Sequence, residues 1–267
     1  MLDQITPLII TYNEEPNIGR VLDQLTWAKE VVVLDSGSTD RTKEIALSFT
    51  NVRWEMRAFD SHSFQWNYGL KQCQIKTEWV LAMDADFILS GDWVQEVGKL
   101  APLDGVGGYL CSFEYAIFGK TLKKCLYPTV ICLFRREGAG YIQDGHTQRI
   151  TLVGTVLPLV GKIIHDDRKP LSRWLVSQSN YAAQEAELIQ TQPWSKLRWS
   201  NRIRKFVVIS PLLAPLFYWF FRRGIFDGLH GLIYALQRMV AEAIISIKLL
   251  EGMISQAKQH SQPLDKN

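Results

Sequence analysis

The sequence predicts an α/β fold built on a mostly parallel sheet flanked by helices. Short, continuous apolar runs alternate with helical patterns over the first hundred residues, which is the rhythm of βαβ units. Two of these runs end directly on an aspartate, Asp35 and Asp84, and parallel strands place such residues at one edge of the sheet. The chain has 267 residues, 47% of them hydrophobic, so it can bury a large core and is neither disordered nor fibrous.

The elements of the first hundred residues follow from this pattern. The expected strands are short runs of β-branched and apolar residues, at 7–11, 31–34, 52–56 and 79–83. The expected helices lie between them: one beginning at Pro16, one from the turn at 36–40 through Phe49, and one around 65–74.

From residue 105 to 136 the pattern changes. Two strand-like runs, 109–118 and 129–134, are separated by Gly, Lys and Pro, and we expect them to extend the sheet with antiparallel strands. A helical pattern returns at 171–189.

The chain beyond residue 190 differs in charge and hydropathy. Residues 188–226 contain no acidic residue and several basic ones. The apolar, aromatic run 206–221 is shorter than the about 20 residues of a spanning helix, and Pro211 and Pro215 interrupt it. Residues 229–250 then carry apolar side chains at intervals of three and four, which is typical of an amphipathic helix.

This basic and aromatic region has three interpretations: a membrane surface, a second copy of the chain, or nucleic acid. Trp194, Trp199 and Trp219 lie among its cations, and this combination favours an anionic bilayer surface. We therefore expect residues 194–250 to bind a membrane and expect no nucleic-acid partner.

The four cysteines have neither the C-x-x-C spacing nor the histidine partners of a zinc site, so we expect buried thiols. The N-terminus lacks the basic and apolar regions of a signal peptide. These features favour a cytoplasmic protein that is peripheral on the inner face of the plasma membrane.

Asp84-Ala85-Asp86 follows a buried strand and can aim two carboxylates at one divalent cation. Mg²⁺ or Mn²⁺ completes its shell with water and phosphate oxygens, so such a site suits a nucleoside diphosphate. A solvated acidic turn is the alternative.

Four motifs stand in order along the chain: Thr11-Tyr12-Asn13-Glu14, the run from Asp35 to Thr42, Asn67-Tyr68-Gly69 and Asp84-Ala85-Asp86. Together they resemble the family 2 glycosyltransferases with the GT-A fold, in particular bacterial lipopolysaccharide-core β-glucosyltransferases. The resemblance implies a GT-A domain over 1–190, with a nucleotide-sugar-binding half at 1–100 and an acceptor-binding half at 101–190. A helical membrane-associating region would follow at 191–267.

The resemblance also implies roles for single residues. It places the nucleotide-sugar donor, expected to be a UDP-sugar, against Thr11, Asn13, Glu14, Asp35, Ser38, Asn67, Asp84 and Asp86. Asp35 would accept a hydrogen bond from the nucleobase ring, and Asp84 would hold the ribose. Asp86 would be the main ligand of Mn²⁺ or Mg²⁺, with Asp84 and His165 as further candidates; His165 could instead be structural.

An inverting transfer needs a base for the acceptor hydroxyl, and Asp144 is our candidate. The related enzymes have His-Glu where this chain has His146-Thr147, so the role is vacant or has moved to Asp144, which could also be only a turn residue. His146 and Arg168 are candidates for contacts to the acceptor or the diphosphate. A structural histidine and a solvated charge run at 166–169 are the alternatives.

The sequence therefore predicts an inverting, metal-dependent glycosyltransferase that acts on a lipid-linked or lipopolysaccharide-type glycan. A nucleotidyltransferase is a weaker alternative, because no Gly-rich basic loop follows the first strand. A non-catalytic nucleotide-sugar sensor or scaffold at the membrane is the alternative from a different class.

Overall fold

The computed structural model describes residues 1–101, 104–124, 126–144 and 147–260. The chain divides into two compact units, Met1–Lys169 and Pro170–Asn267, and each is described by itself. The helix expected at 171–189 belongs to the second unit, whereas the division based on sequence placed it within residues 1–190.

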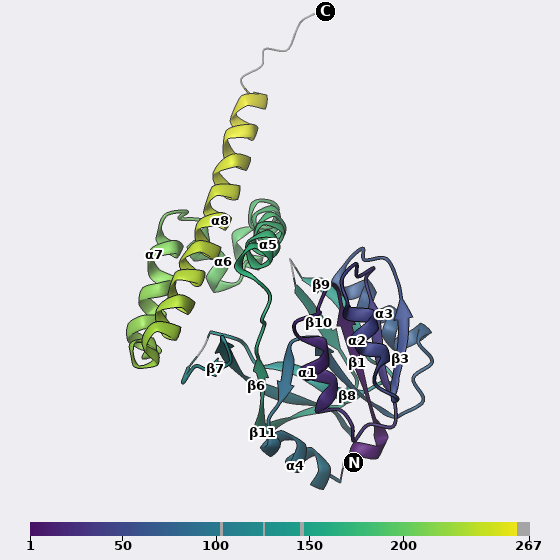
Figure 1. The fold of residues 1–267 in the computed structure, drawn as a ribbon. Helices are drawn as coiled ribbons and strands as arrows, with labels where there is room; N and C mark the ends of the chain where they lie inside the picture. The colour runs from purple at the N-terminus through teal and green to yellow at the C-terminus, as the bar shows by residue number, and fades with distance from the viewer. Residues whose placement is uncertain (102–103, 125, 145–146, 261–267) are drawn as a thin grey trace, which may run out of the picture. The chain divides into compact units, whose positions relative to one another are not determined.

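The first unit is built on one large sheet (Figure 1), whose strand order is β3-β2-β1-β4-β8-β6-β11-β5. The first four strands in this order are parallel to one another, as predicted. They are β1 (Ile5–Thr11), β2 (Val31–Asp35), β3 (Val52–Met56) and β4 (Trp79–Asp84).

The other half of the sheet is mixed. β8 (Val130–Arg135) pairs antiparallel with both β4 and β6 (Val106–Ile117), so the predicted antiparallel extension is confirmed. β11 (Thr155–His165), which the sequence pattern did not reveal, runs parallel to β6 and antiparallel to β5 (Phe87–Leu89). Two short ladders complete the unit: β7 (Lys120–Thr121) on β6, and β9 (Gly140–Asp144) with β10 (Thr147–Thr151).

The helices of this unit are η1 (Leu2–Gln4), α1 (Ile18–Asp23), α2 (Thr42–Leu47), α3 (His62–Gln72) and α4 (Gly91–Lys99). The first long helix does not begin at Pro16. The backbone N–H groups of Asn17 and Ile18 both donate to the carbonyl of Glu14, so the chain makes a turn there before α1 starts. α2 likewise ends before Phe49.

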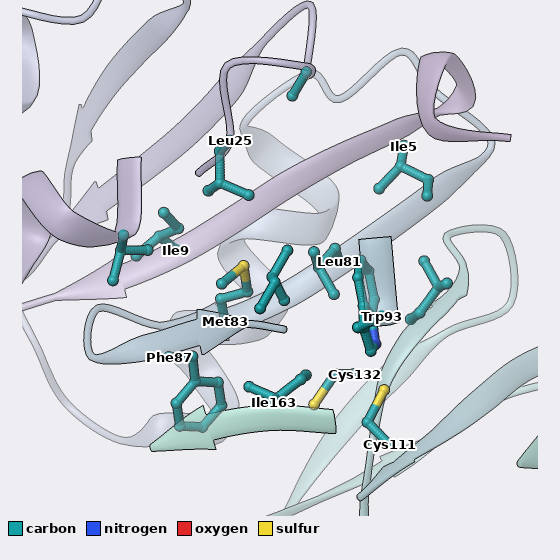
Figure 2. Close-up of a cluster of buried hydrophobic side chains, with 14 of the residues drawn as sticks. Ile5, Ile9, Leu25, Leu81, Met83, Phe87, Trp93, Cys111, Cys132 and Ile163 are labelled. Atoms are coloured by element: carbon teal, nitrogen blue, oxygen red, sulfur yellow. The ribbon is translucent and has the colours of Figure 1, made fainter. Parts of the chain in front are cut away.

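Apolar side chains cover both faces of the sheet. In β1, Ile9 belongs to the cluster on one face and Leu8 to the cluster on the other, because successive side chains of a strand alternate. Figure 2 shows the first cluster, where Ile9, Met83, Trp93 and Ile163 come from four different elements. Burial on both faces is the reason that these strands read as continuous apolar runs.

The cysteines that the structure describes fit the expectation of buried thiols. Cys73, Cys111 and Cys132 are buried and free, and Cys111 and Cys132 lie side by side in the cluster of Figure 2. Cys125 lies outside the described residues.

The second unit is helical. It contains α5 (Leu171–Thr191), η2 (Trp194–Lys196), α6 (Trp199–Arg204), α7 (Ile209–Leu216), the π-helical turn η3 (Phe217–Phe221), η4 (Gly224–Asp227) and α8 (Gly228–His260). α7 and α8 form an antiparallel hairpin, since Tyr218 packs on Tyr234 and the Ser246 hydroxyl donates to the Val207 carbonyl. Among the helices described here, none combines the length and the apolar character needed to cross a bilayer.

Candidate active site

The polar residues expected at the carboxyl ends of the parallel strands do meet at one edge of the sheet. Thr11 at the end of β1 is in register with Asp35 at the end of β2, and the preceding Ile10 is in register with Asp84 at the end of β4. Thr11 and Asp35 are buried. In the described chain, the Thr11 hydroxyl has no hydrogen-bond partner, so a ligand at this edge would find a free polar group.

Asp35 holds the loop that follows β2. Its Oδ2 accepts hydrogen bonds from the backbone N–H groups of Gly37 and Ser38, at 2.9 and 2.8 Å, and its Oδ1 accepts from the Ser38 hydroxyl. Ser38 Oγ in turn accepts from the Asn13 N–H at 2.7 Å. The loop after β1 and the loop after β2 are therefore joined through one carboxylate.

Asn13 completes this connection. Its φ of 53° lies in the left-handed region, which asparagine tolerates better than most residues. In this conformation its Oδ1 accepts from the Thr39 N–H at 2.7 Å. Asn13 and Ser38, both expected against the donor, thus hold the loops after β1 and β2 together.

Asn67 positions β9. Its side-chain amide donates to the Tyr141 carbonyl at 2.8 Å and accepts from the Tyr141 N–H at 2.9 Å. Trp66 is buried and its ring stacks on that of Tyr141, with 5.5 Å between centroids. These contacts orient the strand that ends at Asp144. The side chain of Asp144, the candidate base, and all of His146 lie outside the described residues.

Asp86 and His165 are the centre of the site. The Nε2 atom of His165 lies 3.3 Å from Oδ2 of Asp86. Two atoms of this pair, Oδ1 of Asp86 and Nδ1 of His165, are buried and have no partner among the described residues. Aromatic rings surround the imidazole, with centroid distances of 4.7 Å to Tyr115, 5.2 Å to Tyr127 and 5.7 Å to Phe87.

The charged segment after His165 is folded against α1. Asp166 donates its N–H to the Asp86 carbonyl at 3.1 Å, and its Oδ2 accepts from Arg20 at 2.8 Å. Arg168 also donates to this oxygen through Nε and Nη2, at 3.1 and 2.9 Å. Asn17 connects the segment to α1, because it donates to Asp167 and accepts from the Arg168 N–H. This segment is therefore an ordered wall of the site.

Lys169 brings a second cation to the site. Its ammonium group pairs with Glu14, which is buried, and lies 3.6 Å from Oδ2 of Asp167. Asn17 also donates to Glu14 at 2.8 Å. Glu14 is thus held by groups from both ends of the first unit's sequence.

The carboxylates and cations of this site shift one another's ionisation. Burial and the nearby charge of Asp86 raise the pKa of Glu14 and that of Asp84, each to about 7. Burial also opposes ionisation of Asp86, but the charge and hydrogen bond of His165 and the charge of Lys169 together hold the Asp86 pKa below its usual value. Burial disfavours the charged forms of His165 and Lys169, yet the surrounding carboxylates raise both pKa values. The acids Glu14, Asp84 and Asp86 therefore lie close to one another and to the cations His165 and Lys169.

The metal-ligating atoms of the site fit a hard divalent cation that also binds a substrate. The described residues contain no ready-made group of three metal-ligating side chains. The unpartnered, buried Oδ1 of Asp86 is nevertheless the ligand type that Mg²⁺ and Mn²⁺ prefer, and these ions are commonly held by one or two carboxylates plus substrate phosphates. Asp84 and His165 stand beside it as further candidates.

Several contacts of the site were not predicted from the sequence. Asn17, Arg20 and Lys169 were not candidates, yet they connect the loop after β1 to the segment after β11. Asn17 and Arg20 lie far from Lys169 in sequence, and none of the three belongs to a local motif. The charge run at 166–169 was the only signal, and it is equally typical of a solvated turn.

Comparison with known proteins identifies the family of the chain. The Glycosyl transferase family 2 model matches residues 7–141. A curated relative, the lipopolysaccharide core biosynthesis glycosyltransferase LpsC of Rhizobium meliloti (strain 1021), is 24% identical over 257 residues, which cover 92% of each chain.

Two solved structures are similar at lower identity. S. aureus TarS 1-349 in complex with UDP-GlcNAc is 15% identical, with 95% of this chain and 92% of that chain covered and a TM-score of 0.47. The glucosyl-3-phosphoglycerate synthase of Mycobacterium tuberculosis, in complex with Mn²⁺, UDP and glucosyl-3-phosphoglycerate, is 16% identical, with 70% and 79% covered and a TM-score of 0.45. The family assignment does not depend on them: the matched residues 7–141 are half of the chain and include all four motifs of the site, so the chain belongs to glycosyl transferase family 2 and is a glycosyltransferase.

Proposed function

We propose that this glycosyltransferase is inverting and divalent-metal-dependent, and that it moves a sugar from a UDP-sugar to a lipid-linked or lipopolysaccharide-type glycan at the inner face of the plasma membrane. The observation that carries the proposal is the buried Asp86 carboxylate, with one oxygen 3.3 Å from His165 and the other without a partner among the described residues. His165 and Lys169 already oppose the charge of Asp86, and its second oxygen, unpartnered in the described part of the chain, can act as a ligand for a divalent cation.

Asp35 can bind a nucleobase that has a ring N–H. A carboxylate has about four lone-pair sites, and three of those on Asp35 accept hydrogen bonds from Gly37 and Ser38. The remaining site can accept the ring N–H of uracil, which the family resemblance favours, or that of guanine. The neighbouring Thr11 hydroxyl, which has no partner among the described residues, could also bind the nucleoside.

Asp86 would hold Mn²⁺ or Mg²⁺ on the donor's diphosphate, with Asp84 on the ribose or the metal and His165 at its side. When bound, the ion neutralises the negative charge that grows on the leaving diphosphate. Lys169 pairs with Glu14 and Asp167. Its positive charge also acts on Asp86, and so it lies on the side of the site where the metal would bind. The protein's own task is to orient the donor and exclude water around it.

Asp144 would take the proton from the acceptor hydroxyl. It ends β9, whose position is fixed by the two hydrogen bonds between Asn67 and Tyr141. Because β9 is hydrogen-bonded to α3 in the donor-binding half, the base would keep a fixed position relative to the donor sugar.

The acceptor class rests on two observations. The relative named above takes part in lipopolysaccharide core biosynthesis, and the second unit exposes basic and aromatic side chains that fit a membrane. Both favour an acceptor that is anchored in lipid.

Product analysis tests this function. The purified enzyme is incubated with a panel of UDP-hexoses, Mn²⁺ and core-truncated lipopolysaccharide in vesicles. We expect a new glycoside and free UDP in equal amounts. A separate incubation with UTP and hexose 1-phosphates that released pyrophosphate and formed a UDP-hexose would identify a nucleotidyltransferase. UDP-sugar binding with no product from any acceptor would favour a sensor or scaffold.

A further inference from the structure

The turn between α7 and α8 exposes large apolar side chains. Those most open to solvent are Phe220 (65%), Phe221 (80%), Phe226 (66%) and Leu229 (74%). They come from η3, η4 and the first turn of α8. Large apolar patches on a protein surface commonly mark interaction sites.

The interior of this turn is built to keep its shape. Tyr218 is fully buried, its hydroxyl donates to the Asp227 carboxylate at 3.2 Å, and its ring packs on Tyr234 with 4.7 Å between centroids. Gly224 lies so close that a Cβ there would be 2.2 Å from the Tyr218 ring. The only acidic residue of the turn is therefore turned inward, while its phenylalanines face outward.

The charged side chains of residues 188–250, which include the α7–α8 hairpin, are likewise divided between the interior and the surface. Residues 188–250 are all described, and their acidic residues are Asp227 and Glu242. Both are buried, and Glu242 pairs with Arg204 on α6. The exposed charges are cationic and include Lys196, Lys205 and Arg223. This surface complements anionic lipid headgroups.

We infer that the tip of the α7–α8 hairpin, residues 217–229, inserts as a wedge into the headgroup and upper acyl region of an anionic bilayer. The helical stretch of α7 and η3, residues 209–221, is about 20 Å long at 1.5 Å per residue. It reaches into one leaflet and does not cross the hydrocarbon core. This inference deepens the proposed function, on which it rests for the lipid-anchored acceptor.

A second copy of the chain fits this surface less well. In a symmetric dimer the same patch would face itself, which would bring the cations around the tip of one copy against those of the other. A bilayer instead supplies anionic headgroups for the cations, including Arg223 in the tip, and apolar chains for the phenylalanines of the same segment.

The test measures binding of the full chain to vesicles by sedimentation. One set contains phosphatidylethanolamine with phosphatidylglycerol, and the other contains phosphatidylcholine alone. We expect the wild type to bind the anionic vesicles more tightly, and added salt to weaken that binding. The variant F220S/F221S/F226S should lose about 100-fold in affinity, because three apolar side chains no longer enter the lipid.

Control variants separate insertion from folding and from catalysis. Val160 is 85% exposed on β11 of the first unit, so V160S should bind vesicles as the wild type does. The triple variant should keep its thermal unfolding midpoint and its UDP and Mn²⁺ binding, because the replaced side chains are exposed and belong to the second unit. Charge reversal in K196E/K205E should weaken binding to anionic vesicles and leave binding to phosphatidylcholine unchanged.

Three results would overturn the inference. The first is a wild type that binds UDP but does not bind anionic vesicles. The second is a triple variant that binds UDP and binds these vesicles as tightly as the wild type. The third is a dimeric wild type that the triple substitution makes monomeric, which would assign the patch to a second copy. A wild type that does not bind UDP would contradict the proposed function, and not this inference alone.

Discussion

The imidazole of His165 at the end of β11 lies 3.3 Å from the carboxylate of Asp86, which directly precedes β5. The antiparallel pairing of β11 with β5 creates this contact, since His165 is in register with Phe87. Asp86 also lies two residues after the end of β4, so the contact joins β11 to the segment after β4, where the diphosphate of a donor is expected.

We expect D86N to abolish metal-dependent donor binding and to lower sugar transfer by about 10³-fold, because the unpartnered carboxylate oxygen is lost. The measurement is UDP release with and without Mn²⁺. D92N, at an exposed position on α4, is the matched control. Near-normal turnover of D86N would remove Asp86 from the metal site.

We expect D35N to lower UDP affinity about tenfold and to reduce the preference for UDP over CDP. An amide at this position can donate to the cytosine ring, whereas a carboxylate can only accept from uracil. Calorimetric titration with both nucleotides measures the change. An unchanged UDP to CDP ratio would place the nucleobase elsewhere.

Replacing the candidate base, D144N, should lower the rate of transfer by about 10²- to 10⁴-fold and leave donor binding intact. Single-turnover rates and a thermal shift with UDP and Mn²⁺ report the two effects separately. An active D144N enzyme would show that another group takes the proton.

Stability should depend on pH through Glu14. Its pKa in the folded protein is raised to about 7 by burial and by Asp86, above the value of about 4.3 in an unfolded chain. The folded state therefore binds the proton more tightly, so this group's contribution is complete below about pH 4 and is lost as pH rises through about 7. Urea unfolding between these limits should show a shallower pH dependence for E14Q than for the wild type, whereas E15Q should match the wild type.

The stability of the second unit should depend on the ion pair between Arg204 and Glu242. Both side chains are largely buried, so R204A leaves a buried carboxylate without its cation and should destabilise the helices by about 3 kcal/mol. The double variant R204M/E242L should recover most of this loss, as measured by thermal unfolding. A double variant as unstable as R204A would mean that packing around Arg204, rather than charge, is what matters.

Local pattern was enough to predict part of the fold and the site. The apolar runs of β1, β2 and β4 specify buried parallel strands, and strand ends on one edge necessarily bring Thr11, Asp35 and Asp84 together. The antiparallel pairing of β6 and β8 also followed from the change of pattern at residue 105.

The remaining features depend on contacts between distant segments. β11 has an alternating, half-exposed pattern, and only its pairing with β6 and β5 shows that it carries His165 to Asp86. Asn67 looked like a donor ligand, but its amide binds the Tyr141 backbone. Lys169 reaches Glu14 because the chain after β11 returns to α1, which no spacing in the sequence reveals.

The most direct test of the central claim is a thermal-shift panel of the purified protein with UDP, GDP, CDP and ADP, each with and without Mn²⁺. At about a hundred times its Kd a ligand stabilises the fold by about 2.7 kcal/mol. We expect stabilisation by UDP, only when Mn²⁺ is present, and its loss in D86N. Stabilisation by UDP without Mn²⁺, or by none of the four nucleotides, would contradict a metal-dependent UDP-sugar site at Asp86.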